Sequence, residues 1–148
     1  MAETVVERPR RRFGITRHPY ASLFLPVPIV CFTGALLTDL AYDNSGGNLL
    51  WVNFSSWLLA AGLLFGVIAA ILMLIDFARL VELRTTFGWG SFLLLVVTLV
   101  IEFVNSLVHA RDGWTAVVPT GLILSAISAL LIMSYGWLWH EARYGERP

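Results

Sequence analysis

Three polar residues share one face of a long apolar stretch in the second half of the chain. Glu102, Asn105 and His109 follow the spacing i, i+3, i+7, which places their side chains on one side of an α-helix. Glu102 lies about 14 residues into this stretch, or about 21 Å at the helical rise, so it would sit deep in the hydrocarbon of a membrane. An ionised carboxylate there costs at least a few kcal/mol, so Glu102 needs polar partners or a functional role.

Two polar residues of the preceding apolar stretches are expected at a similar depth. The predicted intramembrane cluster comprises Asp39, Asn53, Glu102, Asn105 and His109, with Arg111 at its rim. The interpretation that we favour is that these groups hydrogen-bond one another between helices and hold them together. The alternative is a proton or ion site, in which Glu102 is neutral because burial disfavours its charged form.

Two histidines mark the opposite end of the apolar stretches. His18 opens the first stretch and His140 closes the last, and two imidazoles at one depth on facing helices are able to ligate a b-type haem. The favoured interpretation is that both are interfacial residues, because Arg17, Trp139 and Glu141 beside them are typical of the end of a span. No cofactor is therefore predicted, and haem b is kept as the alternative.

The sequence lacks the residues that other kinds of chemistry require. The chain has no GxSxG, HExxH, GxGxxG or phosphate-binding loop motif. Its single cysteine, Cys31, excludes an intramolecular disulfide and a thiolate zinc or iron–sulfur ligand set. Ten arginines balance ten acidic residues, which excludes a strongly basic nucleic-acid-binding protein. The sequence thus predicts neither an enzyme nor a nucleic-acid partner.

Four apolar stretches must position the polar residues. Hydrophobic residues make up 57% of the 148-residue chain and charged residues 14%, against about 25% charged in soluble domains. Each stretch exceeds the roughly 20 residues with which a helix crosses a bilayer, and the short linkers predict antiparallel neighbours. The expected fold is an all-α, up-down-up-down four-helix transmembrane bundle. Its spans are about 20–42, 51–77, 88–109 and 117–139, within one membrane domain (18–142) between a basic arm (1–17) and a short tail (143–148).

The arginines predict the orientation of this bundle. Nine of the ten precede the first span, separate the second from the third, or follow the fourth, and only Arg111 lies on the other side. Because cytoplasmic loops are enriched in basic residues, both termini are expected in the cytoplasm.

Glycines and prolines predict the local packing. Gly62 and Gly66 form a GxxxG pattern that allows helices to approach closely. Pro26 and Pro28 remove backbone donors one turn into the first span, which predicts a kink or an irregular turn. We favour a simple distortion at the membrane interface. The alternative is a recess where a ligand meets backbone carbonyls, such as that of Ser22, that have lost their helical partners.

The order of several short motifs resembles a bacterial family of predicted membrane proteins, known as domain of unknown function 2231. The resemblance covers about residues 17–145 and is carried by His18, Pro19, Pro26, Pro28 and Asp39, by Trp57, Gly62 and Asp76, by Asn105 and Arg111, and by Gly136, Trp137, Glu141 and Tyr144. It implies a small membrane protein without an established activity.

This chain departs from the family pattern at the positions on which an argument for a bound cofactor would rest. Members of the family commonly carry extra histidines at positions that read Ala21 and Ser91 or its neighbours here. The pair Trp139-His140 stands where the family has two glycines. The resemblance therefore weakens the haem alternative for this chain.

These observations predict an integral protein of the bacterial inner membrane that acts as a structural or accessory subunit. Its expected partners are the lipid bilayer and a larger membrane complex or a second copy of the chain. A haem- or redox-associated membrane protein and a small proton or ion conductor that uses Glu102 are the alternatives.

Overall fold

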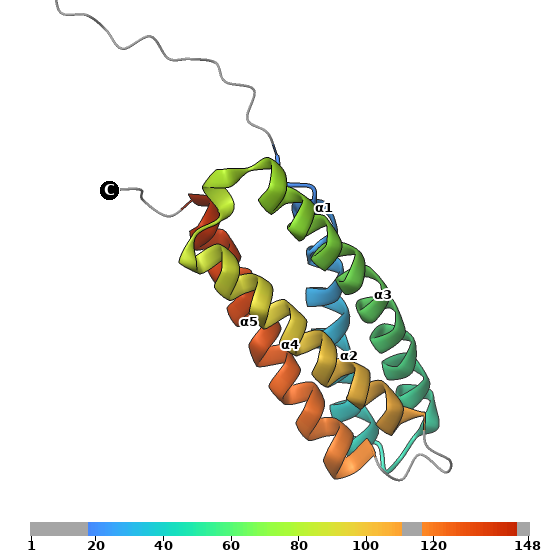
Figure 1. Ribbon diagram of the computed structural model, residues 1–148. Helices are drawn as coiled ribbons and strands as arrows, with labels where there is room; N and C mark the ends of the chain where they lie inside the picture. Colours follow the sequence, from blue (N-terminus) through green and yellow to red (C-terminus); the bar gives the residue numbers. More distant parts are fainter. Residues whose placement is uncertain (1–17, 111–116, 145–148) are drawn as a thin grey trace, which may run out of the picture.

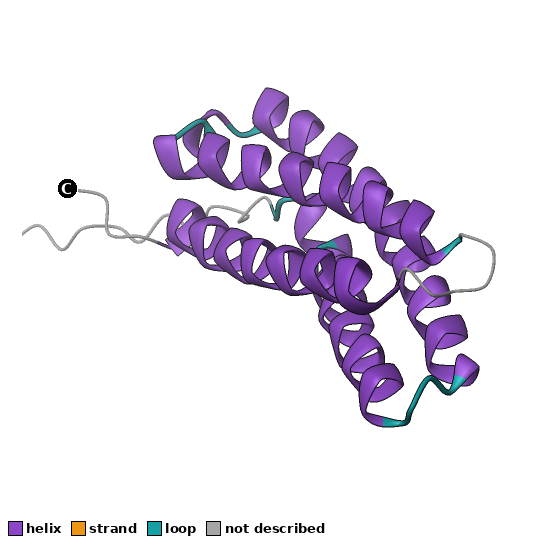
Figure 2. Ribbon diagram, turned by 90° about the horizontal axis from the view of Figure 1, so that it is seen from below, coloured by secondary structure: helices purple, strands orange, loops and turns teal. Residues whose placement is uncertain are grey.

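The computed structural model describes residues 18–110 and 117–144, and the side chains only as far as residue 141 at the C-terminal end. These residues form helices joined by short loops, and this part of the chain contains no strand (Figure 2). In chain order the elements are α1 (Ala21–Phe24), α2 (Pro26–Asn44), α3 (Leu49–Arg79), the tight turn η1 (Val81–Leu83), α4 (Thr86–His109), the wide turn η2 (Val117–Gly121) and α5 (Leu122–Tyr144).

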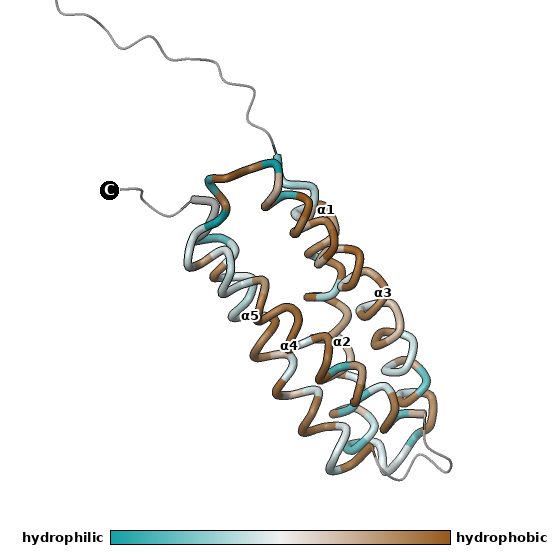
Figure 3. The backbone as a smooth tube through the Cα atoms, in the orientation of Figure 1, coloured by the Kyte–Doolittle hydropathy of each residue, from teal (hydrophilic) through white to brown (hydrophobic). Residues whose placement is uncertain are grey.

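Four helical segments are long and apolar enough to cross a membrane. They are Ala21–Asn44, Leu49–Arg79, Thr86–His109 and Val117–Glu141. Each begins and ends within about two residues of the predicted span, and this confirms the predicted all-α fold with four spans. Figure 3 shows that hydrophobic residues dominate the length of the helices, while hydrophilic residues lie mainly toward the two ends of the bundle.

The four long helices form a ring. Successive helices run in opposite directions, and α1 begins at the same end of the bundle at which α5 ends (Figure 1). α2 packs against α3 and α5, and α4 packs against the same two helices. α2 and α4 therefore lie diagonally across the bundle, as do α3 and α5, so only side chains that reach the central axis can join them.

Polar caps and glycines define the turns between helices. Gly46 and Gly47 adopt φ values of 69° and 91°, a backbone region that glycine enters without a Cβ penalty. The side chain of Asn48 then accepts a hydrogen bond from the amide of Leu50 at the start of α3 (3.1 Å). Thr85 caps α4 in the same way through the amide of Gly88 (3.0 Å). These caps satisfy amide groups that have no partner within the helix.

The first span consists of two helical segments that meet at the predicted place. α1 ends at Phe24, Leu25 separates the two segments, and α2 begins at Pro26. Proline has no amide hydrogen, so Pro26 cannot donate to the carbonyl of Ser22 one turn earlier. The backbone itself stays helical here, because Leu25 has φ −58° and ψ −35° and donates to the carbonyl of Ala21 (3.1 Å). The kink or irregular turn expected from the sequence stays a prediction.

The GxxxG pattern of α3 serves packing inside the bundle. Both glycines are buried. A Cβ atom at Gly62 would lie 2.3 Å from Cε1 of Phe32 on α2, and one at Gly66 would lie 2.5 Å from Cδ2 of Leu99 on α4. The two glycines therefore let neighbouring helices on either side of α3 approach closely.

Candidate functional site: a carboxylate shared by four helices

One buried carboxylate connects all four long helices. Asp39 on α2 is fully buried. Ser55 of α3 donates to its Oδ1 atom (2.6 Å), and Ser125 of α5 donates to its Oδ2 atom (2.6 Å). The Nε2 atom of His109, from the diagonal helix α4, lies 2.9 Å from Oδ1. The single side chain of Asp39 thus connects α2 to both of its neighbours in the ring, α3 and α5, and to the diagonal helix α4.

The hydrogen bonds of His109 indicate how many protons the pair with Asp39 carries. The Nδ1 atom of His109 lies 3.0 Å from the backbone carbonyl oxygen of Asn105. A carbonyl only accepts, so Nδ1 carries a hydrogen. Nε2 faces Oδ1 of Asp39 and also lies 3.2 Å from Oγ of Ser55. A proton shared between Nε2 and Oδ1 would leave the pair as a whole without net charge. Such neutrality would allow two ionisable groups to be buried together.

A second buried carboxyl group lies beside this pair. Asn105 donates through its amide nitrogen to Oε2 of Glu102 (3.0 Å) and to Oγ of Ser125 (2.8 Å). The Oε1 atom of Glu102 is buried without a hydrogen-bond partner in the described part of the chain. Ser128 of α5 lies beside Glu102. The hydroxyl of Ser128 is also buried without a partner among the described residues, so it is the group placed to donate to this oxygen.

The direction of these hydrogen bonds limits what the cluster does with a proton. The amide nitrogen of Asn105 donates both toward Glu102 and toward Ser125. A proton hops along a chain only where each link accepts on one side and donates on the other, and this nitrogen accepts on neither. The direct contacts from Glu102 through Asn105 and Ser125 to Asp39 therefore form no proton chain by themselves.

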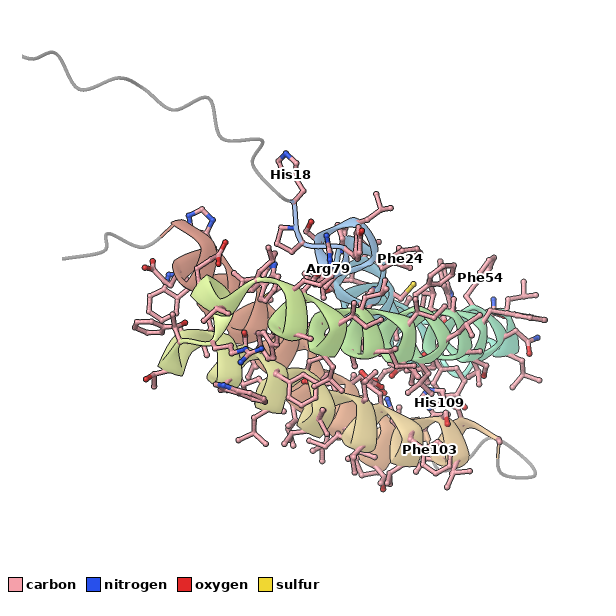
Figure 4. All side chains as sticks on the ribbon, turned by 45° about the horizontal axis from the view of Figure 1, so that its top comes forward. His18, Phe24, Phe54, Arg79, Phe103 and His109 are labelled. Carbon is pink, nitrogen blue, oxygen red and sulfur yellow. The ribbon has the colours of Figure 1, made fainter. Side chains whose placement is uncertain are left out.

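The structure corrects one member of the predicted cluster. Asp39, Glu102, Asn105 and His109 are brought together as expected, but Asn53 is exposed on the outer face of α3. Ser55, two residues later and fully buried, takes its place. Residues two positions apart in an α-helix are rotated by about 200° around its axis. The side chains of Asn53 and Ser55 therefore point to opposite sides of α3. Figure 4 shows His109 between the helices, whereas Phe54 and Phe103 project outward.

The sequence patterns did not identify three serines that belong to the cluster. Ser55, Ser125 and Ser128 are all fully buried around the two carboxyl groups. Ser125 and Ser128 have the spacing i, i+3 on the last span, the same one-face spacing that identified Glu102 and Asn105. This signal was present but weak, because serine is also common at helix contacts as a small residue.

A second buried aspartate ties the opposite end of the bundle. Asp76 of α3 is fully buried, accepts a hydrogen bond from the amide of Ala21 at the start of α1 (2.8 Å) and pairs with Arg79 (3.1 Å). The guanidinium carbon of Arg79 lies 3.8 Å from the ring centroid of Tyr20. Asp76 therefore supplies a negative charge where the amides of α1 need acceptors.

We predict that Asp76→Ala loosens α1 without unfolding the bundle. Hydrogen exchange of the segment from Tyr20 to Leu25 should quicken roughly tenfold, because a hydrogen bond to a charged group contributes about 1.5–3 kcal/mol. Exchange in α5 should not change. The matched control is Glu82→Ala, which removes an exposed carboxylate near the same end of the bundle. Equal exchange in the two variants would contradict the role of Asp76.

The remaining residues singled out in the sequence lie mainly at this second end. Pro19 and Pro28 are buried, Gly136 and Glu141 are half-buried, and His18 and His140 are exposed. His18 projects away from the helices (Figure 4). Arg111 lies outside the described residues.

The two haem-ligand candidates are not enclosed by the bundle. Axial imidazoles normally reach the iron from within a pocket, whereas His18 and His140 are both exposed. In residues 18–110 and 117–144, no three histidine, cysteine, aspartate or glutamate side chains are grouped so as to hold a metal ion. The haem alternative stays a prediction that this geometry does not favour.

The comparisons with known proteins agree with the architecture. Residues 15–147 match a family described as predicted membrane protein (DUF2231). Neither the curated proteins nor the solved structures give a match to this chain. Because the family match extends over almost the entire sequence, as the motifs of its four spans lead one to expect, the chain belongs to the DUF2231 family of predicted membrane proteins.

Proposed function

We propose that this membrane protein is a structural or accessory subunit of a larger complex in the bacterial inner membrane. The observation that carries the proposal is the distribution of polarity. The carboxylates and their partners are buried and bonded to one another, while large apolar side chains such as Trp57 and Leu130 are 78% and 69% exposed. A bundle with a closed polar interior and an apolar outer surface interacts chiefly sideways, with lipid and other membrane helices.

This proposal is preferred to a proton conductor because of the hydrogen bonds at Asn105. Its amide nitrogen donates both to Glu102 and to Ser125, so these direct contacts support a link between helices better than a stepwise transfer toward Asp39. The geometry is instead suited to holding four helices in one arrangement.

Site-specific photo-crosslinking tests the proposed association. A photoreactive amino acid would replace Trp57, Val100 or Leu130, which are exposed on three different helices, in the full chain expressed in its own membrane. Leu59, fully buried on the same helix as Trp57, is the matched control. We expect one protein partner to be captured from one helix face and not from Leu59. Crosslinks to lipid alone at all three exposed positions would contradict the proposal.

We further propose that the end of the bundle where α1 begins faces the cytoplasm. Arg79 and Arg84 lie at that end, one at the end of α3 and the other between η1 and α4, as the preference of basic residues for cytoplasmic loops requires. A cysteine at Gly46 should react with a membrane-impermeant thiol reagent in intact cells, and one at Glu82 should not. The reverse labelling pattern would show the opposite orientation.

A further inference from the structure

A recess opens where the junction between α1 and α2 faces the last turns of α5. Its volume is about 190 Å³. None of its lining residues belongs to the polar cluster around Asp39. The recess is lined by Ser22, Leu25, Pro26, Ile29, Tyr135, Gly136 and Trp139.

Two of the residues that line this recess carry buried polar atoms without partners. The hydroxyl oxygen of Tyr135 and the indole nitrogen of Trp139 are buried and make no hydrogen bond among the described residues. The carbonyl of Ser22 lacks the donor that Pro26 cannot supply. Buried donors are almost always paired in native proteins, so two unpaired donors on residues that line one recess indicate a missing acceptor.

The position of the recess defines the chemistry of that acceptor. Ser22 is the second residue of the first span, and Trp139 lies two residues before the end of the last span. At this depth a bilayer presents the boundary between its headgroups and its acyl chains, where tryptophan and tyrosine are enriched. The acceptors available there are the ester carbonyl oxygens of the lipids.

We propose that the recess binds one glycerophospholipid, whose ester carbonyl oxygens accept hydrogen bonds from Tyr135 and Trp139. The first methylene groups of its acyl chain pack against Leu25 and Ile29. Because the two donor atoms are covered in the empty recess, this binding requires both rings to turn toward the lipid.

Gly136 keeps the recess open. A Cβ atom at this position would meet only Cδ1 of Ile29, at 3.6 Å, which is an ordinary contact. Alanine therefore fits there without strain, whereas the longer side chain of leucine extends into the recess. This difference makes Gly136 the position at which the lipid can be excluded sterically.

The test is native mass spectrometry of the full-length protein, released from its membrane in mild detergent. We expect one glycerophospholipid to remain on the wild-type protein. Gly136→Leu should reduce the lipid-bound fraction at least tenfold, and Gly136→Ala should not. Tyr135→Phe and Trp139→Phe should each weaken retention by about fivefold, the effect of losing one ordinary hydrogen bond. Tyr135→Phe removes one oxygen atom and keeps the ring, so it stays informative if Gly136→Leu does not fold.

Two neighbouring exposed positions on α5 provide matched controls. Trp137→Phe repeats the aromatic change, and Ser134→Leu repeats the change to leucine, outside the recess. Both should retain lipid like the wild type. The proposal is overturned if the wild type carries no lipid, if the retained molecule is a quinone or detergent, or if the controls lose lipid as readily as the recess variants.

Discussion

Asp39→Ala is expected to destabilise the bundle more than any other single polar substitution. It removes hydrogen bonds to three helices at once, those from Ser55, Ser125 and His109. Hydrogen bonds between membrane helices average about 0.6 kcal/mol each, so three contribute about 2 kcal/mol. His109 would also be left buried without its carboxylate, and breaking a buried pair costs about 3–5 kcal/mol. We therefore expect a loss of roughly 2–5 kcal/mol in the free energy of unfolding.

Titration with a denaturing detergent, followed by circular dichroism, measures this loss. Asp43→Ala is the matched control, because Asp43 is exposed on the same helix and its side chain lies outside the cluster. Ser55→Ala and Ser125→Ala should each cost about 0.5–1 kcal/mol. A double-mutant cycle between Asp39 and His109 should give a coupling of at least about 1 kcal/mol. If Asp39→Ala unfolds at the same detergent concentration as Asp43→Ala, the carboxylate does not hold the helices together.

Gly62→Ala is expected to destabilise the bundle although alanine favours helices. Its Cβ atom would lie 2.3 Å from Cε1 and 2.7 Å from Cδ1 of Phe32, and 3.0 Å from Cβ of Cys31. Phe32 is fully buried, so its ring moves only if other core side chains move as well. Overpacking of this kind costs about 1–3 kcal/mol, which outweighs the gain of up to about 1 kcal/mol from replacing a helical glycine.

Two other glycines make this prediction specific. At Gly90, within α4, a Cβ atom would meet only Cδ1 of Leu138, at 3.7 Å, so Gly90→Ala should be neutral or stabilising. At Gly66 the clash is with the end of the Leu99 side chain, which borders an open apolar groove and is able to move. In the same titration, the stability of the Gly66→Ala variant should therefore lie between the stabilities of Gly62→Ala and Gly90→Ala. A stabilised Gly62→Ala variant would contradict the close packing of α2 on α3.

Much of the architecture follows from local properties of the chain. The length of each apolar stretch determines a spanning helix, because a segment that is not helical would leave its backbone groups unpaired in lipid. The glycines and Asn48 determine the first turn, and Pro26 removes a backbone donor from the start of the first span. These features depend on a few neighbouring residues, so they could be predicted without knowing the packing.

The helix rotations could be predicted only in part. On α4 the polar spacing of Glu102, Asn105 and His109 defines one face, and the structure turns that face inward. On α3, Asn53 was selected because it is polar and expected at the depth of Asp39, although the buried residue is Ser55. Gly62 and Gly66 lie on the buried face of α3 together with Ser55, and close packing of these small residues against α2 and α4 determined the rotation.

The sequence by itself determined that this chain has four spanning helices, where the first of them lacks backbone donors, and that carboxyl groups lie within the spans. The tertiary structure alone decided which groups meet. The bond from His109 to Asp39 joins helices that are diagonal in the ring and 70 residues apart in the chain, and the recess joins the first helix to the last. Such contacts depend on the order of helices around the ring and on the rotation of each, which are set by the packing of all four together.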